Sequence, residues 1–356
     1  MYTEPYERVV GILEEKQMDA IIVSNEYNMR YISGFSGATG YLYLSRNKKV
    51  VLTDSRYTIQ AKEEAKGFQV YEIQKKYTDL LREIMKEDGA TKIAIEGKDF
   101  LCYDLEVWKK ELDFVTWTML GEELSMLRAI KRPEELMKIK KAEEIGDIAF
   151  SKILDIIKPG ITELEVAAYL EFYMKQNGAE GLSFDTIVAS GVNSSKPHAV
   201  PGRKKIEKGD FVTMDFGCIY EGYCSDMTRT IVVGKATEEQ KKVYQTVLDA
   251  QMAALSYIKA GYKGSAIDKV ARNVIEKAGY GACFGHGLGH SVGLFIHENP
   301  RLSPSEERII LANVTETVEP GIYIENFGGV RIEDLVVVTE NGCENYTNSP
   351  KELIEL

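Results

Sequence analysis

The stretch IKPGITELEVAAYLEFYMKQNG, residues 157–178, aligns without gaps with IKAGYKGSAIDKVARNVIEKAG, residues 258–279. Glycines near both ends of the two segments coincide, and Val166 falls on Ile267. Two copies are too few for a solenoid, so the repeat favours a duplicated α/β half that packs against its twin. Chance similarity between two amphipathic helices is the alternative. If the duplication is real, we expect a site between the halves, where pockets commonly lie.

The chain has 356 residues, a length that suggests two domains. A polar helical stretch begins at Pro133 and runs to about residue 157, and the region 121–132 before it is a natural boundary. We therefore expect domains at residues 1–122 and 123–356. In the first, the hydrophobic spacing predicts helices at 6–18, 76–87 and 104–112, strands at 20–24 and 92–96, and a hairpin of 41–45 with 49–53.

Charge and composition exclude several classes of partner. The formal net charge of −11 disfavours nucleic acid and anionic membrane surfaces, which need a basic face. The first ten residues lack the apolar run of a secretory signal, and no apolar run approaches the ~20 residues of a membrane span. Five cysteines without a CxxC pair suit reduced thiols rather than a zinc ribbon. We expect a cytoplasmic protein that acts on small molecules or peptides.

Acidic residues lie within apolar stretches that read as strands. Asp215 is in FVTMDF, residues 211–216, and Asp226 lies in the returning stretch 223–233. Asp is depleted in strands, and a buried carboxylate costs several kcal/mol unless it is paired or bound to metal. Both side chains can point inward from neighbouring strands, although solvated aspartates near a turn are the alternative.

The same pattern returns near the carboxyl end. Glu319 lies in TETVEPGIYI, residues 315–324, and Glu333 lies in VRIEDLVVVT, residues 330–339. Arg331 is two residues from Glu333 and so shares its face of a strand, where the two side chains could form an ion pair.

All four histidines of the chain fall in its second half. His286, His290 and His297 lie in GHGLGHSVGLFIHE, between the two pairs of acids. The glycines of this stretch disfavour a helix, each by about 1 kcal/mol relative to alanine, so the motif is not a helical HExxH zinc site. The glycine-rich motif predicts a loop whose backbone can lie close to the site.

Four carboxylates and nearby imidazoles suit Mn, Co, Fe or Zn, and carry enough charge for two divalent ions a few ångströms apart. Such a pair lowers the pKa of a shared water and supplies a hydroxide nucleophile for hydrolysis. From the residues alone, a two-metal hydrolase competes with structural ion pairing.

Five of these residues resemble, in their order and sequence context, the metal ligands of the pita-bread metallopeptidases, which include methionine aminopeptidase, aminopeptidase P and prolidase. They are Asp215, Asp226, His290, Glu319 and Glu333. The stretches SGVNSSKPHAVP, MDFGCIYEGYCSDMTRT, GHGLGHSVGL, HENP and TVEPGIYIENFGGVRIED are similar to the Xaa-Pro branch. NMRYISGFSGATG and VLTDSRYTIQA resemble the creatinase-like amino-terminal domain of that branch. The resemblance implies an α/β (α+β) chain, with a creatinase-like first domain and a pita-bread catalytic domain that contains a pseudo-two-fold repeat.

The resemblance also implies a role for each site residue. Asp226 and Glu333 would bridge two metal ions, Asp215 would bind one ion, and His290 and Glu319 would bind the other, with manganese favoured and cobalt, zinc or iron as alternatives. A bridging hydroxide would attack the carbonyl before proline, and Glu319 would also carry the proton. The remaining matches are His198 and His297, which would position substrate and stabilise the oxyanion, His286, which would line the pocket, and Arg331, which would orient Asp226 or Glu333.

The implied substrates are short Xaa-Pro peptides, and the implied assembly is a homodimer. The motifs do not separate a dipeptidase from an aminopeptidase P; an arginine near the proline, for which Arg301 is the candidate, would favour dipeptides. A creatinase-like enzyme without metal and an inactive binding protein on this scaffold are the alternatives, but neither is expected to keep all five ligands. Methionine aminopeptidase does not need the large first domain.

Overall fold

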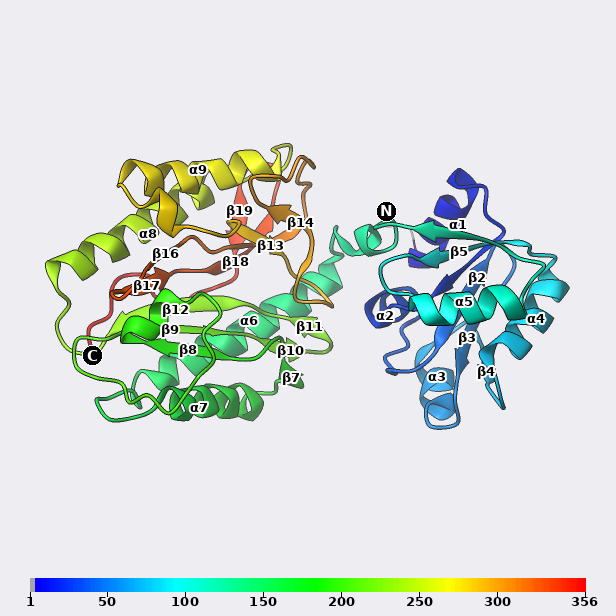
Figure 1. Cartoon of the computed structure of the whole chain (residues 1–356), viewed down its shortest axis with the longest axis horizontal. Coiled ribbons are helices and arrows are strands. Elements are labelled where there is room, and N and C mark those ends of the chain that lie inside the picture. The colour runs from blue at the N-terminus through cyan, green and yellow to red at the C-terminus, as the bar shows by residue number, and fades with distance from the viewer. Residues whose placement is uncertain (1–3) are drawn as a thin grey trace. The chain divides into compact units, whose positions relative to one another are not determined.

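The computed structural model describes residues 4–356 and divides the chain into two compact units, one ending at Arg128 and the other beginning at Ala129. Each unit has its own core of buried apolar side chains, and Figure 1 labels helices and strands of both units. The domain boundary that we place after residue 122 stays a prediction. Within the described residues, no helix combines the length and the apolar character that a bilayer span requires.

The first unit is a six-stranded mixed sheet with the strand order β4-β3-β2-β1-β5-β6. Strands β2 and β3 form the predicted hairpin, and β1, β5 and β6 run parallel to one another. The predicted strands at 41–45, 49–53 and 92–96 coincide with β2, β3 and β5. The elements are α1 Pro5–Glu15, β1 Ala20–Val23, α2 Glu26–Ser33, β2 Tyr41–Ser45, β3 Lys49–Thr53, α3 Thr58–Glu64, β4 Gln69–Glu72, α4 Tyr77–Asp88, β5 Lys92–Glu96, α5 Cys102–Glu111 and β6 Thr116–Leu120.

The first half of the second unit packs two helices against an antiparallel sheet. Apolar side chains of α6 and α7 meet those of β8, β9 and β12 in one core, and β9 pairs with both β8 and β12. Helix α6 ends at Ile153, before the predicted end near residue 157, and a turn follows in which the N–H groups of Ile156 and Ile157 donate to the carbonyl of Ile153 (3.0 and 3.1 Å). The elements are α6 Pro133–Ile153, α7 Glu163–Gln176, β7 Gly181–Leu182, β8 Ile187–Ser190, β9 Phe211–Phe216, β10 Cys218–Tyr220, β11 Tyr223–Cys224 and β12 Met227–Val232.

The second half repeats this plan with its own helix pair and core. Helices α8 and α9 pack on strands β15 to β18, and Figure 1 shows this pair and the α6–α7 pair on opposite sides of the unit. The elements are α8 Glu238–Tyr257, α9 Gly264–Lys277, β13 Gly289–Ser291, β14 Glu298–Leu302, β15 Thr315–Val318, β16 Gly321–Ile324, β17 Gly328–Arg331, β18 Asp334–Val338 and β19 Cys343–Asn345.

The sequence repeat corresponds to α7 and α9 with their flanking turns. Gly160 and Gly261 precede the two helices at φ values of 99° and 91°, and Gly178 and Gly279 follow them at 107° and 89°. A side chain at any of these positions would be strained, so the coinciding glycines mark the same turns in both halves. The duplicated architecture predicted from the repeat is therefore present.

Three of the four acids predicted inside strands lie in breaks between strands. Only Asp215 belongs to a strand, β9. Asp226 lies between β11 and β12, Glu319 between β15 and β16, and Glu333 between β17 and β18. The sequence-based expectation of continuous strands was wrong there, because apolar residues on both sides of each break preserve the pattern of an uninterrupted strand.

We predict that replacing one buried acid outside these breaks stabilises the fold. Glu316 on β15 is fully buried, and neither of its carboxyl oxygens has a hydrogen-bond partner within residues 4–356. Its burial raises the pKa of the carboxyl well above its usual value. Glu316→Val should raise the free energy of unfolding at pH 8 by about 1–3 kcal/mol, measured by urea denaturation, because it removes an unsatisfied polar group.

The increase in the free energy of unfolding caused by Glu316→Val should be smaller at pH 5 than at pH 8. An acid whose pKa is higher in the folded than in the unfolded protein favours folding at low pH, and this contribution is lost as the pH rises. Glu344→Val on β19 of the same sheet, where the side chain is exposed, is the control and should change the unfolding free energy by less than about 0.5 kcal/mol. A Glu316→Val protein that unfolds at lower urea than the wild type at both pH values would contradict this prediction.

Candidate metal centre

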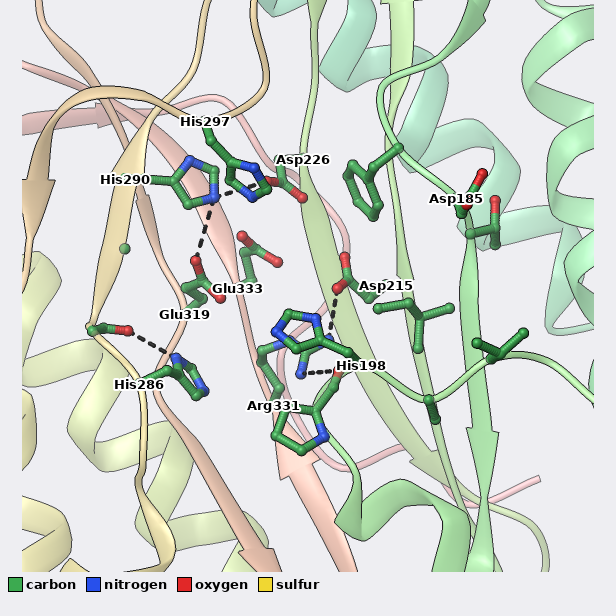
Figure 2. A pocket seen from close by; sticks show the side chains of 18 of the residues that line it. Asp185, His198, Asp215, Asp226, His286, His290, His297, Glu319, Arg331 and Glu333 are labelled. Atoms are coloured by element: carbon green, nitrogen blue, oxygen red, sulfur yellow. Dashed lines mark hydrogen bonds and ion pairs between the residues drawn. The ribbon is translucent and has the colours of Figure 1, made fainter. Parts of the chain in front are cut away.

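One pocket of about 640 Å³ in the second unit is lined by side chains from both halves. The first half supplies Asp185, Asp215 and Asp226, and the second half supplies Glu319, Glu333 and three of the four histidines. Figure 2 shows these side chains facing one another across the pocket. The structure brings together every site residue predicted from the sequence: His198, Asp215, Asp226, His286, His290, His297, Glu319, Arg331 and Glu333.

The strand breaks position the acids, because each break frees a backbone N–H for a bond to another element. Glu333 N donates to the carbonyl of Thr228 (3.1 Å), which ties the two halves together at the site. Glu319 N donates to the carbonyl of Leu288 (2.9 Å), and Asp226 N donates to the buried carboxylate of Glu143 (3.2 Å). The backbone that carries each acid is thus fixed from outside its own strand.

Three carboxylates converge in this centre. Carboxylate oxygens of Asp215, Asp226 and Glu333 all lie within 4.8 Å of one another, and Asp226 and Glu333 are almost completely buried. His290 Nε2 lies 3.4 Å from Asp226 Oδ2 and 3.6 Å from Glu319 Oε1. Asp215 Oδ1 is buried without a hydrogen-bond partner in the part of the chain that the structure describes.

The pKa shifts of the acids and of His290 indicate that a bound cation would stabilise the centre. Burial, reinforced by the neighbouring carboxylates, raises the pKa of Asp226 and of Glu333 well above their usual values, and burial raises the pKa of Glu319 to about 7. Burial, with His297 nearby, lowers the pKa of His290 to about 3, so its ring is neutral. His290 Nδ1 lies 3.1 Å from the carbonyl of Ser291, which can only accept, so the proton is on Nδ1 and the lone pair of Nε2 faces the acids. This donor set fits divalent metal ions.

Arg331 anchors one edge of the cluster. Its Nη2 donates to Asp215 Oδ2 (2.6 Å) and its Nε to Thr228 Oγ1 (2.9 Å). Thr228 Oγ1 in turn donates to Glu333 Oε2 (2.6 Å). In the described residues Arg331 forms an ion pair with Asp215 and not the one that the sequence suggested with Glu333, which it reaches only through Thr228. That Arg331 orients Asp226 or Glu333 stays a prediction. Glu333 lies beyond the end of β17, so a strand face shared with Arg331 does not extend to it.

His286 is held by a tyrosine that sequence reasoning missed. Tyr323 Oη accepts from Arg331 Nη1 (2.7 Å) and lies 3.0 Å from His286 Nε2, to which it can donate its proton. His286 Nδ1 lies 2.8 Å from the carbonyl of Gly287, and burial lowers the pKa of this ring to about 4. The neutral ring is therefore bonded on both sides. The only sequence signal for Tyr323 is its place in a strand next to Glu319.

His198 and His297 have rings that remain available to a ligand. Within residues 4–356, the ring nitrogens of His198 and His297 make no hydrogen bond or ion pair. Both residues line the pocket. His297 packs edge-to-face on His290, with ring centroids 4.6 Å apart.

A buried glutamate holds the segment that carries His198. Glu163 accepts hydrogen bonds from Ser190 N (2.8 Å), Asn193 Nδ2 (3.0 Å) and Gly202 N (3.2 Å), on both sides of His198 in sequence. Sequence analysis did not single out Glu163, which reads as an ordinary acid in the first turn of a helix.

Comparison with known proteins identifies the family. The model of metallopeptidase family M24 matches residues 137–340, and that of the creatinase/prolidase N-terminal domain matches residues 6–130. The chain therefore belongs to metallopeptidase family M24. The resemblance and the fold class inferred from the motifs are confirmed.

Relatives with two different names are about equally similar to this chain. The Xaa-Pro dipeptidase of Pyrococcus furiosus is 40% identical over 99% of both chains. The structure of the Xaa-Pro dipeptidase from Bacillus anthracis matches with a TM-score of 0.97 at 41% identity, covering 99% of both chains. The X-Pro aminopeptidase structure from Thermotoga maritima matches with a TM-score of 0.92 at 39% identity, also over 99% of both.

We predict that manganese stabilises the protein more strongly as the pH rises from 6 to 8. The raised pKa values of the three acids mean that protons occupy ligand positions at low pH, and metal binding must displace them, at up to about a tenfold change in affinity per proton per pH unit. For the metal-free protein the sign is opposite: its melting temperature should fall as the pH rises from about 4 towards 7.

The measurement is thermal unfolding of chelator-treated protein with and without MnCl₂ at pH 6, 7 and 8. Glu333→Gln, which removes one charge but keeps the shape, is the matched control and should reduce the manganese-dependent shift at every pH. A shift in melting temperature that is the same at all three pH values would show that these carboxyls do not bind the metal.

Proposed function

We propose that this member of metallopeptidase family M24 is a metal-dependent Xaa-Pro peptidase that hydrolyses the bond before proline in short peptides. The observation that carries the proposal is the convergence of three acids and one neutral imidazole in a pocket with two unbonded histidine rings. The names of the relatives support the choice of substrate.

The proposed ligands are those that the family resemblance implies, and the proximity of Asp215, Asp226 and Glu333 supports them. Two divalent ions would be held by Asp215, Asp226, His290, Glu319 and Glu333. Hard carboxylate oxygens with one imidazole nitrogen suit manganese, with cobalt, zinc and iron as alternatives. When bound, the two ions would lower the pKa of a shared water and polarise the carbonyl of the scissile bond.

The protein's own groups would handle the proton. Glu319 Oε1 accepts from Thr317 Oγ1 (3.0 Å), which holds this carboxyl beside His290. A carboxylate beside the reacting atoms can act first as a general base and then as a general acid. Glu319 would therefore accept a proton from the attacking water and pass it to the departing proline nitrogen.

The histidines and Arg331 would bind substrate, stabilise the charge that develops during the reaction and position the ligands. His198 and His297 would bind substrate and stabilise the negative charge that develops on the carbonyl oxygen. Arg331 would fix Asp215, and His286, held between Tyr323 and Gly287, would complete the pocket wall. The homodimer implied by the resemblance and the cytoplasmic location expected from the composition stay predictions.

Substrate length is the property to measure, since both dipeptidases and aminopeptidases are among the relatives. Arg301 lines the pocket, and a guanidinium is suited to the free carboxylate of a dipeptide. We predict that protein stripped with chelator is inactive and that Mn²⁺ or Co²⁺ restores hydrolysis of Ala-Pro or Ala-Pro-Ala, assayed together by release of alanine.

Asp226→Ala should reduce the rate by at least about a hundredfold, with circular dichroism showing a folded protein. Full activity after complete chelation would rule out the metal mechanism. Metal-loaded wild type that cleaves Ala-Ala and Ala-Ala-Ala as well as the proline peptides would contradict the Xaa-Pro assignment.

A further inference from the structure

One carboxylate in the pocket has no part in the proposed metal site. Five carboxylates line the pocket, and four of them are Asp215, Asp226, Glu319 and Glu333. The fifth is Asp185, which lies just before β8, and Figure 2 shows it apart from the other four. Its side chain is exposed and makes no hydrogen bond or ion pair with any group in residues 4–356. Asp185 is thus a free negative charge on the pocket wall.

The cationic side chains of the pocket are placed elsewhere. Arg331 is committed to Asp215 through a 2.6 Å ion pair. Arg301 lies on β14, in the second half of the unit, whereas Asp185 belongs to the first half. The pocket therefore has an anionic wall in one half and a cationic side chain in the other.

Apolar side chains accompany Asp185 on its wall. Phe184 and Ile187 flank it closely in sequence and line the same pocket, and so does Val200, which is 86% exposed. Basic side chains bury their methylene stems against apolar surface while the charged end reaches a polar partner. A wall that offers apolar surface and one free carboxylate therefore suits lysine or arginine.

The opposite charges of the two walls decide which residue of a substrate would lie against Asp185. Arg301 suits the carboxylate on the proline side of the scissile bond, which leaves the anionic wall for the residue before proline. We propose that Asp185 binds a basic side chain on the N-terminal residue of the substrate, so that Lys-Pro and Arg-Pro sequences are preferred. This proposal rests on the proposed function.

The test compares two substrates that differ only by one charged group. Lysyl-proline and norleucyl-proline have side-chain stems of equal length, but only lysine carries an ammonium. For manganese-loaded wild type we expect kcat/KM to be about three- to tenfold higher for lysyl-proline. In Asp185→Asn this ratio should fall to about one, through loss on lysyl-proline alone. Asp155→Asn, an exposed acid outside the pocket, is the matched control and should keep the wild-type ratio.

The other results overturn the proposal in distinct ways. An equal loss on both substrates in Asp185→Asn would assign Asp185 to the α-ammonium of every substrate. Wild-type kcat/KM values on both substrates would show that Asp185 does not bind substrate. If wild type cleaves neither peptide, the proposed function fails instead. The role of Asp185 is then decided by calorimetry, which compares the affinities of wild type and Asp185→Asn for lysyl-proline and norleucyl-proline.

Discussion

The structure of the second unit depends on one electrostatic constraint: carboxylates from two halves of the chain are held within a few ångströms of one another, away from water. Asp215, Asp226 and Glu333 meet within 4.8 Å. Buried like charges repel strongly, and without a counter-ion such acids take up protons instead of ionising. The raised pKa values of Asp226 and Glu333 express this cost. A divalent cation would offset it, so the same residues that destabilise the metal-free centre would make it a strong metal site.

Much of the surrounding structure holds these acids in place against their repulsion. Arg331 supplies a buried cation to Asp215, and Thr228 links the same guanidinium to Glu333. A second arginine, Arg229, is almost fully buried, pairs with Asp334 (2.8 Å) and donates a hydrogen bond to the backbone carbonyl of Glu333. Removing one member of a buried ion pair typically costs 3–5 kcal/mol, so these arginines tie the integrity of the fold to the geometry of the centre.

The sequence was most informative where chemistry and local conformation act together. The repeat predicted two related halves, because glycine is needed at the same turns on either side of α7 and α9. The acids in apolar stretches predicted their burial. The glycines around His290 correctly excluded a helix, although His290 lies on strand β13 and not in the predicted loop. The partners of Arg331 could not be predicted, since Asp215 is 116 residues away and meets it only through tertiary packing. Tyr323 and Glu163 were missed for the same reason, because only their distant hydrogen bonds distinguish them from ordinary residues of a strand and a helix.

The metal content of the protein decides whether the acid cluster binds two divalent ions. The measurement is elemental analysis of chelator-treated protein that is reloaded with manganese, freed of excess metal by gel filtration, and referred to the protein concentration. Four carboxylates and one imidazole predict about two manganese ions per chain. Retention of no manganese, or of a single ion that Asp226→Ala also retains, would contradict the account.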